Sequence, residues 1–177
     1  MSDISLELWQ ERMRQVPSLE SIDVHELLPQ QEPFVMIDRL VEISEKTTAT
    51  QMKVREDNLF VEGDELDACA LAENIAQTCA ARLGFINKYI FLKGVQLGFI
   101  GAIRAMKVES LPHVGDVLDT RIDVLQQIMD LTLVDAIVKV GERVICTAEM
   151  KIALADELVG ENGGETTSTD YNKKEED

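Results

Sequence analysis

The stretch from Asp67 to Gly84, DACALAENIAQTCAARLG, decides the fold because it places one carboxylate, Glu73, in a segment built mainly from small residues. Alanine favours helices, and its small side chain lets neighbouring backbone approach closely. Asp67 is a typical N-cap, and Gly84 stands where a left-handed residue would end the helix. A surface helix would carry a broad polar face, whereas this segment has few polar side chains. The stretch therefore predicts a long helix that is covered by a sheet.

Two polar residues of this helix are candidates for a functional site. Glu73 and Gln77 are four residues apart and share one face of the helix. A carboxylate in such apolar surroundings is either satisfied by a neighbour, such as Asn74 or Arg104, or is the working group of a site. We favour the second interpretation, and we expect Gln77 to brace the Glu73 carboxylate from one turn away.

The rest of the chain predicts short N-terminal helices followed by a strand-rich region. Residues 3–16 have apolar side chains at helical spacing, and Pro17 stops that helix. Residues 35–43 and 47–55 alternate as a strand pair does. Four longer strand candidates follow the small-residue helix: 95–108, 118–124, 134–140 and 144–154, the last two joined by a Gly141-Glu142 turn. This order predicts an α+β fold in which a long central helix is wrapped by a curved antiparallel sheet.

Composition and charge limit the classes of function. The net charge of −16 argues against a nucleic-acid partner. Residues 156–177 carry eight acidic residues and two lysines without apolar periodicity, so we expect a disordered acidic tail. We therefore divide the chain into an N-terminal helix and linker (1–23), one folded domain (24–155) and this tail.

The chain shows no signal-peptide pattern, and its longest apolar run, residues 89–103, is too short to span a bilayer. Three cysteines are an odd number and lack metal-ligand spacing. These features predict a cytoplasmic protein without a membrane span, a metal or a cofactor. We expect Cys69 and Cys79 to fill the core.

Three segments resemble those of one enzyme family, the hotdog-fold 3-hydroxyacyl-acyl-carrier-protein dehydratases. LLPQQEPFVMIDRL (27–40) is similar to the family's LLPHRYPFLLVDRV type of segment, and LAENIAQTCAA (71–81) resembles its LEAMAQ helix. VQLGFIGAIRAMKVESLPHVGDVL (95–118) resembles the strand that leads into its Pro-Gly-Asp-like turn. The resemblance covers about residues 24–154 and is closer still to a divergent branch found with aryl-polyene and flexirubin-type pigment pathways. It implies the hotdog fold and dehydration of 3-hydroxyacyl thioesters on acyl carrier protein.

The resemblance assigns Glu73 to the family's catalytic carboxylate and Gln77 to the glutamine that follows it. The family's histidine lies in a Gly-His-Phe-Pro segment before the helix, but the corresponding stretch here, NLFVEGDELDACALAE, contains no histidine. A second family histidine, in Leu-Pro-His-Arg, is replaced by Gln30. A glutamine amide cannot act as a base near neutral pH, so both departures affect the chemistry.

The resemblance also suggests substrate contacts. We expect the thioester to lie along the Glu73 helix, where backbone N–H groups near Ala70, Leu71 and Ala72 would polarise the carbonyl. Gln30 and Gln77 would line the site, and Gly98 and Phe99 would contact the acyl chain. His25 is either a surface residue of a capped turn or an acid–base group that enters the site across a dimer interface. We expect His113 to belong to a turn.

Acyl carrier protein is the expected partner, together with a second copy of this chain or a related hotdog subunit. An acidic carrier protein needs a local basic patch, which is either formed by Arg82, Lys88, Lys93, Arg104 and Lys107 or is no more than ordinary surface charge. Two other functions stay open: a non-catalytic acyl-binding or partner subunit that has lost the histidine, and a hotdog thioesterase.

Overall fold

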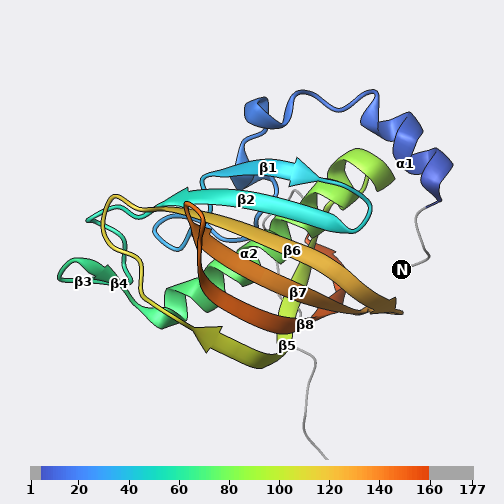
Figure 1. Ribbon diagram of the computed structural model, residues 1–177. Helices are drawn as coiled ribbons and strands as arrows, with labels where there is room; N and C mark the ends of the chain where they lie inside the picture. The colour runs from blue at the N-terminus through green and yellow to red at the C-terminus, as the bar shows by residue number, and fades with distance from the viewer. Residues whose placement is uncertain (1–4, 160–177) are drawn as a thin grey trace, which may run out of the picture.

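The computed structural model describes residues 5–159, for Val95 and residues 155–159 only as backbone. Helix α2 (Ala68–Phe85) begins where the sequence predicts, because the Asp67 carboxylate accepts a hydrogen bond of 2.7 Å from the Cys69 N–H. Figure 1 shows α2 running along one face of a curved sheet, with the N-terminal segments lying near its far end.

The sheet has six antiparallel strands in the order β1-β2-β6-β7-β8-β5. The strands are β1 (Arg39–Ile43), β2 (Thr47–Lys53), β5 (Val95–Val108), β6 (Val117–Ile128), β7 (Leu131–Val140) and β8 (Arg143–Val159). A separate hairpin of β3 (Val61–Glu62) and β4 (Glu65–Leu66) precedes α2. Gly141 has φ +58° in the two-residue turn between β7 and β8, which confirms the predicted hairpin. The four strands expected after α2 are all present.

The core lies between α2 and the inner face of the sheet. Side chains along the middle of β6 and β7 alternate between the two faces, so that every second one is buried. The inward set includes Ile122 and Val138, which belong to the same apolar cluster as Leu71 and Ile75 of α2. Burial of this cluster fixes the helix against the sheet.

Helix α1 (Leu6–Met13) and the 3₁₀ turns η1 (Leu19–Ser21) and η2 (Val24–Glu26) form a second apolar cluster around the end of α2. Trp9 of α1 is buried, and its ring centroid lies 6.4 Å from that of Phe85. The predicted N-terminal helix is therefore confirmed over residues 6–13 and is packed onto the domain. Residues 1–4 lie outside the described part of the chain.

The expected helix end at Gly84 is wrong. The chain continues through α2 into the π-helical turn η3 (Ile86–Phe91), and the left-handed residue that ends it is Leu92, with φ +54°. Gly84 has a different role, because a Cβ atom there would lie 2.1 Å from the carbonyl oxygen of Leu27. Glycine is needed at this position for the close approach of two backbones rather than for a turn.

Three further expectations need correction. Strand β1 begins at Arg39 rather than at residue 35. Strand β8 continues to Val159, so the first four residues of the expected tail belong to the sheet, while residues 160–177 lie outside the described part. Cys69 is exposed rather than in the core. Cys79 is buried as expected, and its burial raises the pKa of the thiol to about 12.

None of the helices within residues 5–159 has the length and apolar character needed to cross a membrane.

Substitution of Gly84 tests the close contact between α2 and Leu27. Gly→Ala in a helix normally stabilises by up to about 1 kcal/mol. We expect Gly84→Ala instead to lower the free energy of unfolding by about 1–3 kcal/mol, because the Leu27 backbone must move. Urea denaturation measures the change, and Ala72→Gly in the same helix is the control, with an expected loss of about 1 kcal/mol. A stabilised Gly84→Ala variant would contradict the contact.

Candidate active site

The side chain of Gln77 joins the helix, the candidate carboxylate and a distant loop. Its Nε2 donates hydrogen bonds to Glu73 Oε1 at 2.9 Å and to the carbonyl oxygen of Phe34 at 2.6 Å. Its Oε1 accepts a hydrogen bond of 2.6 Å from the Met36 N–H. The amide is completely buried, and its two ends have different partners, so its orientation is fixed. The hydrogen bond between Gln77 and Glu73 that the sequence suggested is therefore present.

Asn74 holds the same loop from the next position on α2. Its Nδ2 donates to the Met36 carbonyl oxygen at 2.7 Å, and its Oδ1 accepts from the Thr120 hydroxyl at 2.5 Å. Asn74 is fully buried and makes these bonds away from Glu73, so it is not the partner of that carboxylate. Together Asn74 and Gln77 occupy the backbone N–H and C=O of Met36, so this residue pairs with helix side chains rather than with a strand. The sequence signal was present, as two amides in a helix that has few polar side chains.

A cavity of about 590 Å³ runs between α2 and the inner face of the sheet. Its wall contains Glu73, Ala76, Ala80 and Leu83 on one stripe of α2. The strands and loops add apolar residues such as Pro29, Phe99, Val134 and Ile152, the glycine Gly98, and polar residues that include Gln30, Glu45 and Lys46. The volume is within the range of small-molecule sites. The cavity therefore brings together four residues named from the sequence: Glu73, Gln30, Gly98 and Phe99.

Other residues named from the sequence lie elsewhere. Gln77 stands behind Glu73 and is not on the wall. Ala70 and Leu71 are completely buried in the core, and the Ala70 N–H already donates to the Asp67 carbonyl oxygen at 3.0 Å. The structure gives no support to the expected role of Ala70 and Leu71 in polarising the thioester carbonyl, because neither residue lines the cavity.

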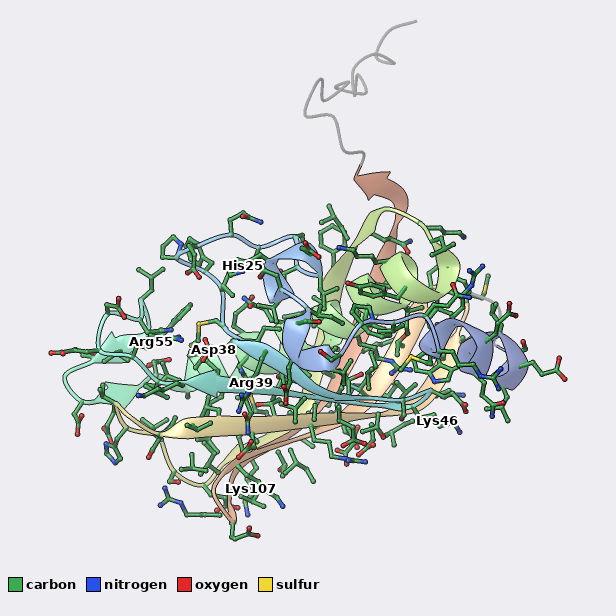
Figure 2. The ribbon with its side chains drawn as sticks, turned by 90° about the horizontal axis from the view of Figure 1, so that it is seen from above. His25, Asp38, Arg39, Lys46, Arg55 and Lys107 are labelled. Carbon is green, nitrogen blue, oxygen red and sulfur yellow. The ribbon has the colours of Figure 1, made fainter. Side chains whose placement is uncertain are left out.

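The two histidines do not line the cavity either. His25 Nδ1 lies 2.6 Å from Asp23 Oδ1, and its Nε2 lies 3.4 Å from Glu32 Oε1. The hydrogen bond with Asp23, supported by Glu32, raises the pKa of His25. Figure 2 shows His25 well separated from Lys46, which is on the cavity wall. His113 lies in the loop before β6, where its N–H donates to Asp116 Oδ2.

The far end of the cavity contains a buried cation, Arg82. Its guanidinium donates to the carbonyl oxygen of Ser44 at 2.8 Å, to the Thr48 hydroxyl at 3.2 Å and to the Glu45 carbonyl oxygen. Burial lowers its pKa to about 10. Arg82 therefore clamps the β1–β2 turn and cannot belong to an exposed basic patch. The sequence could not predict the burial of Arg82, because this burial depends on the β1–β2 turn, which is distant in the chain.

Two carboxylates lie on this wall, Glu73 of α2 and Glu45 of the β1–β2 turn, and Glu73 is the one that the Gln77 amide braces. Among the described residues, no group of three or more histidine, cysteine, aspartate or glutamate side chains could hold a metal ion. Glu73 can donate or accept a proton, but neither histidine of this chain, the residue type that the resembled family pairs with this carboxylate, lies on the wall.

Loss of the Gln77 amide tests its role as the brace. We expect Gln77→Leu to lower the free energy of unfolding by about 2 kcal/mol, because the buried Met36 N–H loses its acceptor. Gln126→Leu is the control, since Gln126 is exposed and its loss should change stability by less than about 0.5 kcal/mol. Urea denaturation of both variants measures the difference, and equal stabilities would contradict the bracing role.

Comparisons with known proteins place this site in a family. The model of the ApeP-like family, which is described as ApeP dehydratase, matches residues 22–161 of this chain. The 3-hydroxyacyl-[acyl-carrier-protein] dehydratase FabZ of Caldanaerobacter subterraneus subsp. tengcongensis is 27% identical over 147 residues, which cover 78% of this chain and 100% of that protein. The FabZ of Thermoanaerobacter pseudethanolicus is 29% identical over 147 residues, which cover 78% of this chain and 99% of that protein.

Solved structures agree on the fold. The dehydratase heterocomplex ApeI:P from Xenorhabdus doucetiae has a TM-score of 0.72 at 20% identity and covers 77% of this chain and 93% of that chain. A hypothetical thioesterase with coenzyme A from Streptococcus pneumoniae has a TM-score of 0.54 at 12% identity and covers 68% of this chain and 87% of that chain. The predicted hotdog fold is confirmed, and the chain belongs to the family of ApeP-like dehydratases.

Proposed function

We propose that this protein dehydrates 3-hydroxyacyl thioesters carried on acyl carrier protein and that Glu73 is a catalytic residue. The observation that carries the proposal is the position of Glu73, which stands beside Ala76, Ala80 and Leu83 on the wall of a cavity of about 590 Å³ in a member of a dehydratase family. An acyl chain fits the apolar wall, and its thioester end then lies beside the carboxylate. The two FabZ relatives are described as 3-hydroxyacyl-acyl-carrier-protein dehydratases, which agrees with this substrate class.

The reaction removes one molecule of water. A base takes a proton from the α-carbon, a double bond forms between the α- and β-carbons, and the β-carbon–oxygen bond breaks. The departing hydroxyl takes up a proton and leaves as water. Glu73 exchanges a proton with the β-hydroxyl or with the α-carbon, while the Gln77 amide holds the carboxylate in place. Gln30 lines the same wall and helps to orient the thioester.

A related hotdog subunit supplies the missing acid–base group in our proposal. Strand β5 is an edge of the sheet, and its residues Phe99, Ile100 and Ile103 are exposed. An exposed apolar edge strand favours pairing with another chain. Phe99 and Ile100 also line the cavity, so a subunit paired along β5 would close that side of it. The dehydratase of Xenorhabdus doucetiae is itself described as a heterocomplex, which supports a related partner over a second copy of this chain.

The proposed carrier-protein surface uses four of the five cations named from the sequence. Arg82 is excluded by its burial, whereas Lys93, Arg104 and Lys107 are exposed and Lys88 is partly exposed. Lys88 and Lys107 have acidic partners, Glu26 and Glu109. Arg104 belongs to β5 and lies close to the proposed subunit contact. The cytoplasmic location that the sequence suggested stays a prediction.

A second function, that of a non-catalytic partner subunit, is favoured by one observation: neither histidine lies on the cavity wall. In that case the chain would bind acyl groups and complete the active site of another subunit. A thioesterase activity would give a free acid as the product. The three functions therefore differ in product, and one experiment separates them.

The test is mass spectrometry of a 3-hydroxyacyl carrier protein after incubation with the protein. We expect loss of water with the native chain, alone or mixed with a histidine-bearing hotdog subunit, and a reduction of roughly a hundredfold or more with Glu73→Gln. Glu142→Gln, in the exposed β7–β8 turn, is the control and should keep full activity.

Full dehydration by Glu73→Gln would contradict the role of Glu73. A free acid as the product would show a thioesterase. An unchanged carrier protein that still binds, with and without the histidine-bearing subunit, would show a non-catalytic binder.

The β5 edge gives a separate prediction for assembly. We expect Ile103→Lys to weaken assembly with the histidine-bearing hotdog subunit, because a charge on the edge strand opposes pairing with another chain. Val144→Lys on β8 is the control, since Val144 is 38% exposed and Ile103 is 39% exposed. Light scattering after size-exclusion chromatography measures the mass of each variant mixed with that subunit. The same mass for both variants would exclude β5 as the subunit contact.

A further inference from the structure

The imidazole ring of His25 lies between carboxylates of two different segments. Its Nδ1 is 2.6 Å from Asp23 Oδ1, and its Nε2 is 3.4 Å from Glu32 Oε1. Asp23 caps the turn η2, because its carboxylate also accepts a hydrogen bond of 3.0 Å from the His25 N–H. Glu32 belongs instead to the loop 29–34. His25 therefore connects η2 to this loop.

The loop 29–34 supplies Gln30 to the wall of the candidate active site. In the described part of the chain, the loop makes hydrogen bonds to other segments at two places. The carbonyl oxygen of Phe34 accepts one from the buried amide of α2, and Glu32 contacts His25. The Oε1 atom of Gln30 is buried without a hydrogen-bond partner among the described residues. The position of Gln30 therefore depends on the two contacts that hold the loop.

The protonation state of His25 decides whether its contact with Glu32 is attractive. The Asp23 carboxylate can only accept a hydrogen bond, so it keeps a proton on Nδ1 in both the charged and the neutral ring. The proton that the ring loses is then the one on Nε2, which faces Glu32. A neutral ring presents a lone pair to the Glu32 carboxylate, and two acceptors repel each other. Deprotonation thus breaks the bond to the loop and spares the bond to Asp23.

The two carboxylates also set the pH at which this change occurs. The hydrogen bond with Asp23, supported by that with Glu32, raises the pKa of His25 above its usual value of 6.5. A raised pKa means that the bonded form is fully present below pH 6.5 and is lost as the pH rises through the pKa of the folded protein. The contact is therefore closed in mildly acidic solution and opens on the alkaline side.

Two other cations lie near this contact, and each is bound to a carboxylate of its own. Lys88 of η3 pairs with Glu26 of η2 at 2.5 Å. Arg55, which follows β2, pairs with Asp38 at 2.8 Å, and its pKa is raised by Asp38 and more weakly by Glu32. The imidazole ring is thus the cation that is hydrogen-bonded to the loop, and its loss of charge is not replaced by a neighbouring bond.

We propose that His25 is a positioning residue that holds the loop 29–34, and with it Gln30, against the active site while its ring is protonated and releases them when Nε2 loses its proton. The inference rests on the proposed function, because it concerns binding of the thioester to the same wall. His25 acts from outside the cavity and does not touch the substrate. This role differs from that of the missing acid–base group.

The first test is an NMR titration of isotope-labelled protein from about pH 5.5 to about pH 9, a range that brackets an ordinary histidine pKa. We expect the side-chain amide signals of Gln30 to move with the same midpoint as the ring signals of His25. His25→Asn keeps a short amide beside Asp23 but cannot reach Glu32, so the Gln30 signals should stay still. His113→Asn is the control and should titrate like the native protein.

A second variant separates the proton from the contact. Glu32→Gln replaces the carboxylate with an amide, which can accept a hydrogen bond from the charged ring and donate one to the neutral ring. We expect the ring of His25 still to titrate in this variant, with a lower midpoint because a charged partner is lost. The Gln30 signals should keep their low-pH positions throughout the titration.

Binding gives the functional readout. The dissociation constant of 3-hydroxybutyryl-pantetheine is measured at both ends of the pH range. We expect the native protein to bind this thioester roughly three- to tenfold more weakly at the alkaline end, because one hydrogen bond that orders the wall is lost. Glu32→Gln should bind with the same affinity at both ends.

Gln30 signals that do not follow the His25 ring in the native protein would overturn the inference. So would Gln30 signals that titrate in His25→Asn as they do in the native protein, or native affinity that is equal at both ends of the range. Failure of the proposed function gives a different result. The native protein would then not bind the thioester at either pH, while the Gln30 signals would still follow the His25 ring.

Discussion

The structure around the candidate site depends on the hydrogen bonds of one buried amide, Gln77. This side chain connects α2 to a loop that lies about forty residues earlier in the chain. It also donates a hydrogen bond to the carboxylate of Glu73. Both ends of a buried amide must find partners, so the loop, the helix and the carboxylate are fixed together. The geometry of Glu73 is thus a consequence of how the loop 34–36 is held.

The small residues of α2 serve two needs that a surface helix does not have. On one side Gly84 allows the backbone of Leu27 to approach, which brings the N-terminal segments against the end of the helix. On another side Ala76 and Ala80 leave the space of the cavity beside Glu73. Tight packing and an open cavity therefore come from the same choice of small side chains, applied to different faces of one helix.

Local patterns in the sequence predicted most of the fold. The Asp67 cap, the alternation of β6 and β7 and the Gly141 turn depend on neighbours close in the chain, and all are present in the structure. The errors involve contacts over long distances. Gly84 is explained by Leu27, and the burial of Arg82 depends on the β1–β2 turn. Local spacing could not distinguish a helix cap from a close backbone contact.

In the candidate site, too, local contacts could be predicted and long-range contacts could not. Glu73 and its bond to Gln77 were predicted, because a helix fixes the relation between residues four apart. The extent of the cavity and the loop contacts of Asn74 could not be predicted, since they require the relative positions of the helix and distant segments.

The most direct measurement is a crystal structure of the protein, with any required partner subunit, bound to a stable analogue of a long-chain 3-hydroxyacyl pantetheine. Our account predicts the β-hydroxyl or the α-carbon within about 3.2 Å of the Glu73 carboxylate, the reach of a general acid or base. It also predicts the alkyl chain in the cavity beside Ala76 and Ala80. A thioester bound away from Glu73, or an alkyl chain outside this cavity, would contradict the account.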